Sequence, residues 1–115
     1  MTMQAFDLTE LQEYRPEKFV TKPLYNGSGN KAMLLHLLPN QEVPMHPHTD
    51  WEVTLIPQTG EAVLFSEDGT EIPLKTGMLY YGGLSPVFGV QNRGAQPFQT
   101  VVLLARGGSG AGPKP

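Results

Sequence analysis

Four side chains that can bind a metal ion lie close together near the middle of the sequence. They are His46, His48, Asp50 and Glu52, within residues 45–52. In an extended strand alternate side chains share a face, so this spacing predicts that all four point the same way. Imidazole nitrogens and carboxylate oxygens are common ligands of transition metals. The pattern therefore indicates a divalent metal site, whereas the alternative is a polar loop with two solvated histidines.

The third histidine has a different setting. His36 lies between Leu35 and Leu37 in an apolar segment, which is typical of a core or rim histidine. It becomes a further candidate for the site only if its strand faces the interior.

Residues 40–60 resemble the first motif of the cupins, which reads G-x5-H-x-H-x3-E-x6-G. Asn40 stands at the first glycine, His46, His48 and Glu52 stand at the ligands, and Gly60 follows one residue later than in the motif. Asparagine tolerates the left-handed turns that glycine favours. The longer spacer predicts a wider turn before Gly60.

A second cupin motif is matched only in part. Gly77 and Asn92 lie at the expected separation, but Phe88 stands where the family has a histidine as its fourth ligand. The resemblance covers about residues 31–105. It implies an all-β fold, the cupin double-stranded β-helix or jelly-roll barrel.

The resemblance also implies a function, with two alternatives. In the first, His46, His48 and Glu52 hold Fe, Mn, Ni or Zn, and a small organic ligand binds in the barrel for a reaction that the sequence does not assign. In the second, Phe88 replaces the missing ligand with an aromatic wall, and the barrel binds or senses a small molecule without metal and without catalysis. Four residues are candidates for the pocket lining: Phe88, Tyr81, Met78 and His36.

Composition excludes several other classes of protein. The chain has 115 residues with 13 Gly, 11 Pro, no Cys and a net charge of -3. Proline and glycine disfavour helices, and without cysteine there is neither a disulfide framework nor a thiolate metal site. The sequence has no cluster of basic residues that would indicate nucleic-acid binding, and it has no apolar run long enough to span a bilayer. We expect a cytoplasmic protein.

The chain divides into three parts. Residues 1–17 form an N-terminal segment with a short helix, starting at a capping box from Asp7 to Glu10. Residues 18–106 form the barrel, with about eight short extended segments separated by turns. Residues 107–115 are a Gly- and Pro-rich tail that we expect to be disordered. The resemblance implies a homodimer, with residues 18–25 and 101–104 as candidate pairing segments.

Overall fold

The protein is built from nine β-strands. The computed structural model describes residues 2–107. In chain order the strands are β1 (Val20–Asn26), β2 (Asn30–Leu37), β3 (Glu42–Pro47), β4 (Trp51–Thr59), β5 (Glu61–Ser66), β6 (Glu71–Lys75), β7 (Tyr80–Leu84), β8 (Val87–Gln91) and β9 (Phe98–Arg106).

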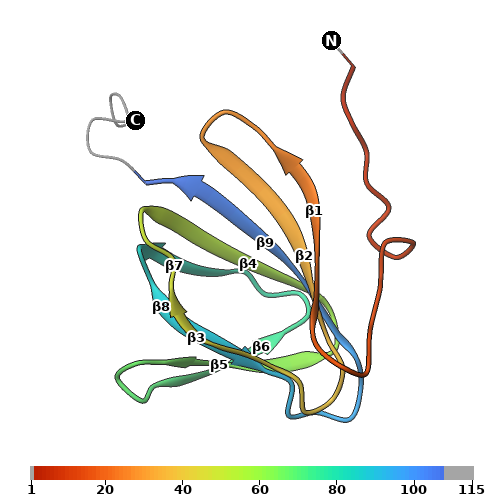
Figure 1. The fold of residues 1–115 in the computed structure, drawn as a ribbon, viewed down its shortest axis with the longest axis vertical. Coiled ribbons are helices and arrows are strands. Elements are labelled where there is room, and N and C mark those ends of the chain that lie inside the picture. The colour runs from red at the N-terminus through yellow and green to blue at the C-terminus, as the bar shows by residue number, and fades with distance from the viewer. Residues whose placement is uncertain (1, 108–115) are drawn as a thin grey trace.

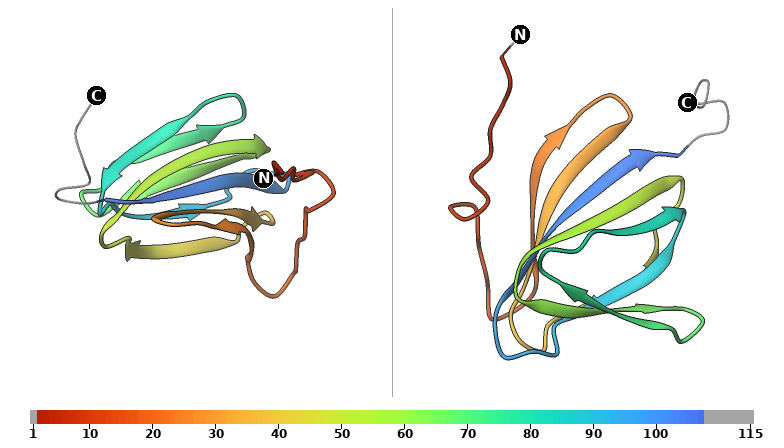
Figure 2. Two further views of the ribbon diagram at one scale, coloured as in Figure 1. Left: turned by 90° about the horizontal axis from the view of Figure 1, so that it is seen from above. Right: turned by 180° about the vertical axis from the view of Figure 1, so that it is seen from behind.

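These strands form two antiparallel sheets that face each other (Figures 1 and 2). One sheet has the order β1-β2-β9-β4-β7 and the other has the order β3-β8-β5-β6. The prediction of an all-β jelly roll is confirmed. Strand β3 is the addition to the expected set, and it carries the first histidine of the pair.

The core lies between the two sheets and follows the two-residue period of each strand. On β4, Val53 and Leu55 are buried, while the alternate residues Glu52 and Thr54 are only half-buried. Side chains of successive residues point to opposite faces. The inward positions of β4 therefore begin at Trp51, which packs against the core.

One expected strand boundary is wrong, and one candidate pairing segment lies inside the sheet. The expected bend at Gly82 and Gly83 is instead part of β7, whose pairing with β4 shifts register between Glu52 and Thr54. Residues 101–104 lie in β9, which pairs with β2 on one side and β4 on the other. This segment therefore has no free edge for pairing with a second chain, whereas β1 is an edge strand.

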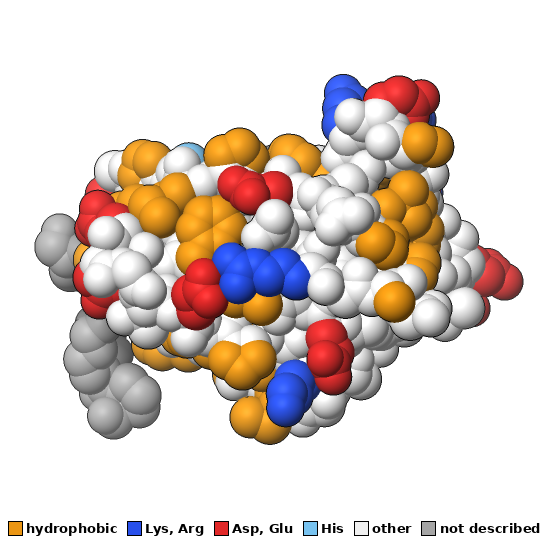
Figure 3. All heavy atoms as spheres, turned by 90° about the horizontal axis from the view of Figure 1, so that it is seen from below, with side chains coloured by type: hydrophobic (Ala, Val, Ile, Leu, Met, Phe, Trp, Pro, Cys, Tyr) orange, Lys and Arg blue, Asp and Glu red, His pale blue; other side chains and the backbone are white. Residues whose placement is uncertain are grey.

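The surface mixes charged and apolar side chains. Figure 3 shows one face, on which acidic and basic side chains lie among hydrophobic ones. An exposed ion pair joins Arg93 and Glu71 at 2.8 Å. In the part of this face that residues 2–107 form, acidic and basic side chains are mixed, and the face is not predominantly basic. In residues 2–107 no helix is long and apolar enough to cross a membrane.

The N-terminal segment forms turns at residues 8–11 and 16–17, and no helix occurs in residues 2–107. Asp7 does cap the first of these turns, because its Oδ1 accepts hydrogen bonds from the amides of Thr9 and Glu10 at 3.1 Å each. The expected helix does not continue, since only Leu11 closes an α-type bond, to the Asp7 carbonyl. Of the C-terminal tail, only Gly107 lies within the described residues, so the expected disorder of residues 108–115 falls outside them.

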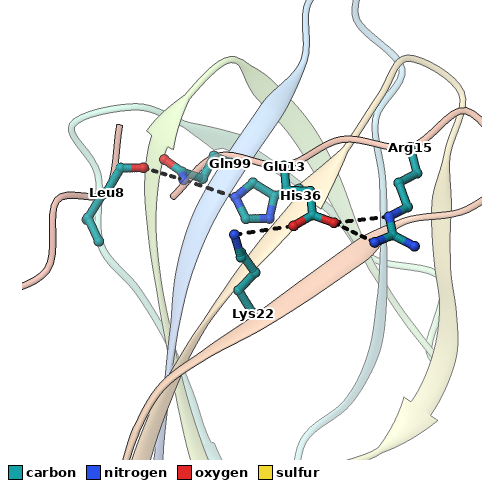
Figure 4. Close-up of polar contacts among 6 residues, drawn as sticks. All are labelled: Leu8, Glu13, Arg15, Lys22, His36 and Gln99. Carbon is teal, nitrogen blue, oxygen red and sulfur yellow. Dashed lines mark hydrogen bonds and ion pairs between the residues drawn. The ribbon is translucent and has the colours of Figure 1, made fainter. Parts of the chain in front are cut away.

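This segment crosses the outer face of the five-stranded sheet above a buried histidine (Figure 4). Gln99 Nε2 donates both to the Leu8 carbonyl at 2.9 Å and to His36 Nε2 at 3.0 Å. The Tyr14 ring meets the His36 ring edge-on, with centroids 5.3 Å apart. The N-terminal segment therefore seals the outer face over His36.

Candidate functional site

The site is built around the two histidines of the motif. His46 lies one residue before the end of β3 and pairs with Phe88 of β8. Both side chains line the same cavity, in which Phe88 is buried and His46 is exposed. The Nδ1 of His46 lies 2.9 Å from the Pro44 carbonyl, and the Nδ1 of His48 lies 3.0 Å from the Pro86 carbonyl. A carbonyl oxygen only accepts, so each Nδ1 carries a proton and each neutral ring keeps the Nε2 lone pair free. The two rings lie 4.3 Å apart.

A cavity of about 500 Å³ opens between the sheets beside this pair. Most of its lining is apolar, and the polar groups are few. The lining residues are Phe19, Thr21, Lys31, Met33, Leu35, Val43, His46, Pro47, His48, Thr49, Trp51, Leu55, Phe88, Val90, Val102 and Leu104. An apolar hollow with a few polar groups is typical of a small-molecule site.

Phe88 forms one wall of this cavity. Its ring stacks on the His48 ring, with centroids 4.3 Å apart and planes inclined by 13°. A second cavity of about 560 Å³, lined by residues of β4 to β8, also contacts Phe88 and Leu55. These two residues therefore separate two chambers of the interior, and the aromatic wall that we expected at Phe88 is present.

Glu52 does not join the histidines. The chain turns between β3 and β4, where the Trp51 amide donates to the His48 carbonyl at 3.1 Å and Asp50 has a left-handed φ of 68°. This turn breaks the extended alternation from which a shared face was expected. Val53, not Glu52, points into the interior.

Glu52 lies on the outer face of the five-stranded sheet. Its carboxylate accepts a hydrogen bond of 2.5 Å from the hydroxyl of Tyr81. This bond and the nearby carboxylate charge raise the pKa of Tyr81. Tyr81 itself is 63% exposed and lies at the rim of the second cavity.

The residues present do not fit the metal site that the cupin resemblance implies. In the described part of the chain no three His, Cys, Asp or Glu side chains are placed to hold a metal ion. Phe88 stacks on His48, Val53 takes the inward position on β4 and lines the second cavity, and neither side chain can coordinate a metal. The geometry therefore leaves His46 and His48 as polar groups of a cavity.

Burial also affects the charge of this pair. It lowers the pKa of His48, and the neighbouring His46 lowers it further, while the bond to the Pro86 carbonyl opposes both effects. His48 therefore stays neutral to lower pH than an ordinary histidine.

Two of the residues expected in the pocket lie elsewhere. His36 is fully buried, but on the outer face of the sheet beneath the N-terminal segment. Met78 is 52% exposed and lines neither of the two interior cavities. The adjacent Tyr80 does line the second cavity, and its hydroxyl accepts from the Lys75 amide at 3.0 Å.

Lys31 and Trp51 are site residues that the sequence did not suggest. Both line the cavity of the histidine pair. The alternation of β2 offered a signal for Lys31, because it shares the inward face with Met33 and Leu35. Its charge argued against that position.

Comparison with known proteins shows what this fold is similar to. No protein-family model matches the sequence, and no curated protein matches it. Among solved structures, the protein TT1209 of Thermus thermophilus is 29% identical, with a TM-score of 0.82 over 92% of this chain and 100% of its own. An RmlC-like cupin of Desulfovibrio desulfuricans is 20% identical, with a TM-score of 0.82 over 92% of this chain and 99% of its own.

A Klebsiella pneumoniae protein described as having a double-stranded β-helix domain is also similar. It is 24% identical, with a TM-score of 0.84 over 95% of each chain. The shared architecture shows that this chain has the double-stranded β-helix fold of the cupins. Fold alone does not assign a reaction.

Proposed function

We propose that this chain binds a small, largely apolar organic molecule in the cavity of His46 and His48, and that it does so without a metal ion. The observation that carries the proposal is the cavity itself, about 500 Å³ of mainly apolar lining with a histidine pair as its main polar feature. A cavity of this size is in the range of small-molecule sites. The proposal is one of binding, and it assigns no chemical step.

The histidines fix the orientation of the ligand in this proposal. With Nδ1 donating to a backbone carbonyl, each ring offers Nε2 as an acceptor when neutral and as a donor when protonated. Phe88, stacked on His48, holds that ring in place and offers an aromatic surface to the ligand. The remaining lining excludes water and supplies the affinity.

A neutral apolar dye, N-phenyl-1-naphthylamine, tests the proposal on chelator-treated protein. We expect saturable binding of one dye molecule per chain. Val102→Phe adds a ring inside the cavity, and its matched control Val63→Phe makes the same change on β5, at a position that lines neither interior cavity.

The first variant should weaken dye binding about tenfold, which corresponds to about 1.4 kcal/mol. The control should stay within about twofold of the wild-type protein. A thermal melt of each variant confirms that it folds. Equal dye affinity in both folded variants would contradict the proposal.

A further inference from the structure

Two basic side chains lie against the single tryptophan at the edge of the cavity. Lys31 Nζ lies 4.8 Å from the centroid of the Trp51 ring, and Arg106 Cζ lies 4.5 Å from it. Lys31 and Trp51 line the cavity, together with the histidine pair. Arg106 is the strand partner of Trp51 and is exposed.

Neither of these cations has an acidic partner in the described part of the chain. The ion pairs of residues 2–107 join Glu13 to Arg15 and Lys22, and Glu71 to Arg93. No Asp or Glu lines the cavity. Glu52 lines a surface hollow together with Lys31. Its carboxylate accepts the Tyr81 hydroxyl on the outer face and forms no ion pair with Lys31.

Two like charges beside one ring repel each other, because their distances to the ring centroid place them within a Debye length of about 10 Å of each other. The face of the tryptophan offsets part of this cost through cation–π attraction. An anion bound beside the ring would remove the repulsion and gain charge-assisted hydrogen bonds. A low-dielectric cavity wall strengthens this attraction for a charge at its mouth.

We infer that the ligand of this cavity is an organic carboxylate, with its apolar body inside the barrel and its anionic group at Lys31 and Trp51. The inference rests on the proposed function, which it deepens by naming the ligand class. Arg106 supplies a second positive charge beside Trp51. The absence of carboxylates from the cavity lining selects against cationic ligands.

Three ligands with the same chain and different head groups test the charge preference: octanoate, octanol and octylammonium. Calorimetric titration measures their affinities, and the emission of Trp51, the only tryptophan in the chain, reports binding in the cavity. We expect octanoate to bind at least tenfold more tightly than octanol, and octylammonium to bind most weakly. The advantage of octanoate should shrink as salt is added.

Lys31→Met removes the charge but keeps an apolar stem of similar length. We expect this variant to lose about tenfold in affinity for octanoate, while its affinity for octanol stays within about twofold of the wild-type value. Lys75→Met is the matched control, because Lys75 is an exposed residue of β6 outside the cavity lining. It should bind all three ligands as the wild-type protein does.

The outcomes separate the inference from the proposed function. Equal binding of octanol and octanoate, unchanged in Lys31→Met, would overturn the carboxylate preference and leave a neutral-ligand site. Binding of none of the three ligands would overturn both. Tighter binding of octylammonium than of octanoate would overturn the inference alone.

Discussion

At the scale of single residues, His36 is the most deeply buried titratable group outside the cavity. Its side chain is fully buried, its Nε2 accepts from Gln99, and its Nδ1 has no hydrogen-bond partner in the described part of the chain. Burial lowers its pKa, and the charge of Lys22 lowers it further, while the Val20 backbone and Glu13 act in the opposite direction. Folding therefore favours the neutral ring.

This lowered pKa predicts a loss of stability in acid. Above the ordinary histidine pKa of about 6.5 both states carry a neutral ring. As the pH falls below that value, the unfolded chain takes up the proton first, and stability is lost down to the lower pKa of the folded state. The melting temperature should therefore fall between about pH 7.5 and about pH 5.

His36→Leu should reduce that fall. The change removes the titration, and Gln99 still donates to the Leu8 carbonyl. The measurement is the difference between the melting temperatures at the two pH values, which is independent of any constant loss of stability. An equally large difference in His36→Leu would show that other groups cause the acid sensitivity.

The spacing of residues along the chain predicted the positions of only some of the candidate metal ligands. His46 and His48 lie together because they are two residues apart, His46 near the end of β3 and His48 directly after it. Glu52 lies on the other face because Asp50 adopts a left-handed conformation, and the type of a residue alone does not reveal that turn. Because the turn shifts the alternation of side chains by one position, Val53 takes the inward position that was expected for Glu52.

At the scale of elements, two glycines in turns differ in how closely other atoms approach them. Gly60 and Gly77 both have left-handed φ values, of 76° and 91°. A Cβ on Gly60 would collide with the carbonyl oxygen of Pro97, whereas a Cβ on Gly77 would have no neighbour within 4 Å. Gly60 thus allows the turn after β4 to pass close to the start of β9.

Alanine substitution at these two positions should therefore have unequal effects. We expect Gly77→Ala to lower the free energy of unfolding by about 1 kcal/mol through backbone strain. Gly60→Ala should lower it by about 3 kcal/mol or more, because strain and overlap add. Urea denaturation measures both values. Equal losses would show that the backbone near Pro97 yields easily.

The turn residues also explain why the strands were largely predictable. Gly60, Gly69 and Gly77 all have positive φ values, and each lies between strands that the sequence had separated. Asn92 is buried and bonds the carbonyls of Leu37 and Gln96. The N-terminal helix failed because its stability depended on packing that a single capped turn does not provide.

At the scale of the whole molecule, homodimer formation stays a prediction. The resemblance to cupins implies it, and β7, an edge strand, exposes Tyr81 and Leu84 by 63% and 57%. Exposed apolar edges are typical sites of association. Light scattering should give twice the chain mass of 12.6 kDa, and Leu84→Lys should shift the protein toward the single-chain mass. A wild-type mass of one chain would refute the prediction.

The interior of the barrel contains the proposed ligand site. Two facing sheets leave two chambers separated by Phe88 and Leu55, and only one chamber contains histidines. The sequence could predict the barrel from its turns and strand periods. It could not predict the partition, since this depends on which side chains meet across the two sheets.

The most direct test of a metal-independent ligand site is one calorimetric titration, run in two forms. N-phenyl-1-naphthylamine is titrated into chelator-treated protein, and again after adding Fe(II), Mn(II), Ni(II) or Zn(II). We predict equal affinity in both forms, with Glu52→Gln indistinguishable from the wild-type protein, because Glu52 lies on the outer face. Dye binding that appears only with metal, and is lost in Glu52→Gln, would contradict the account.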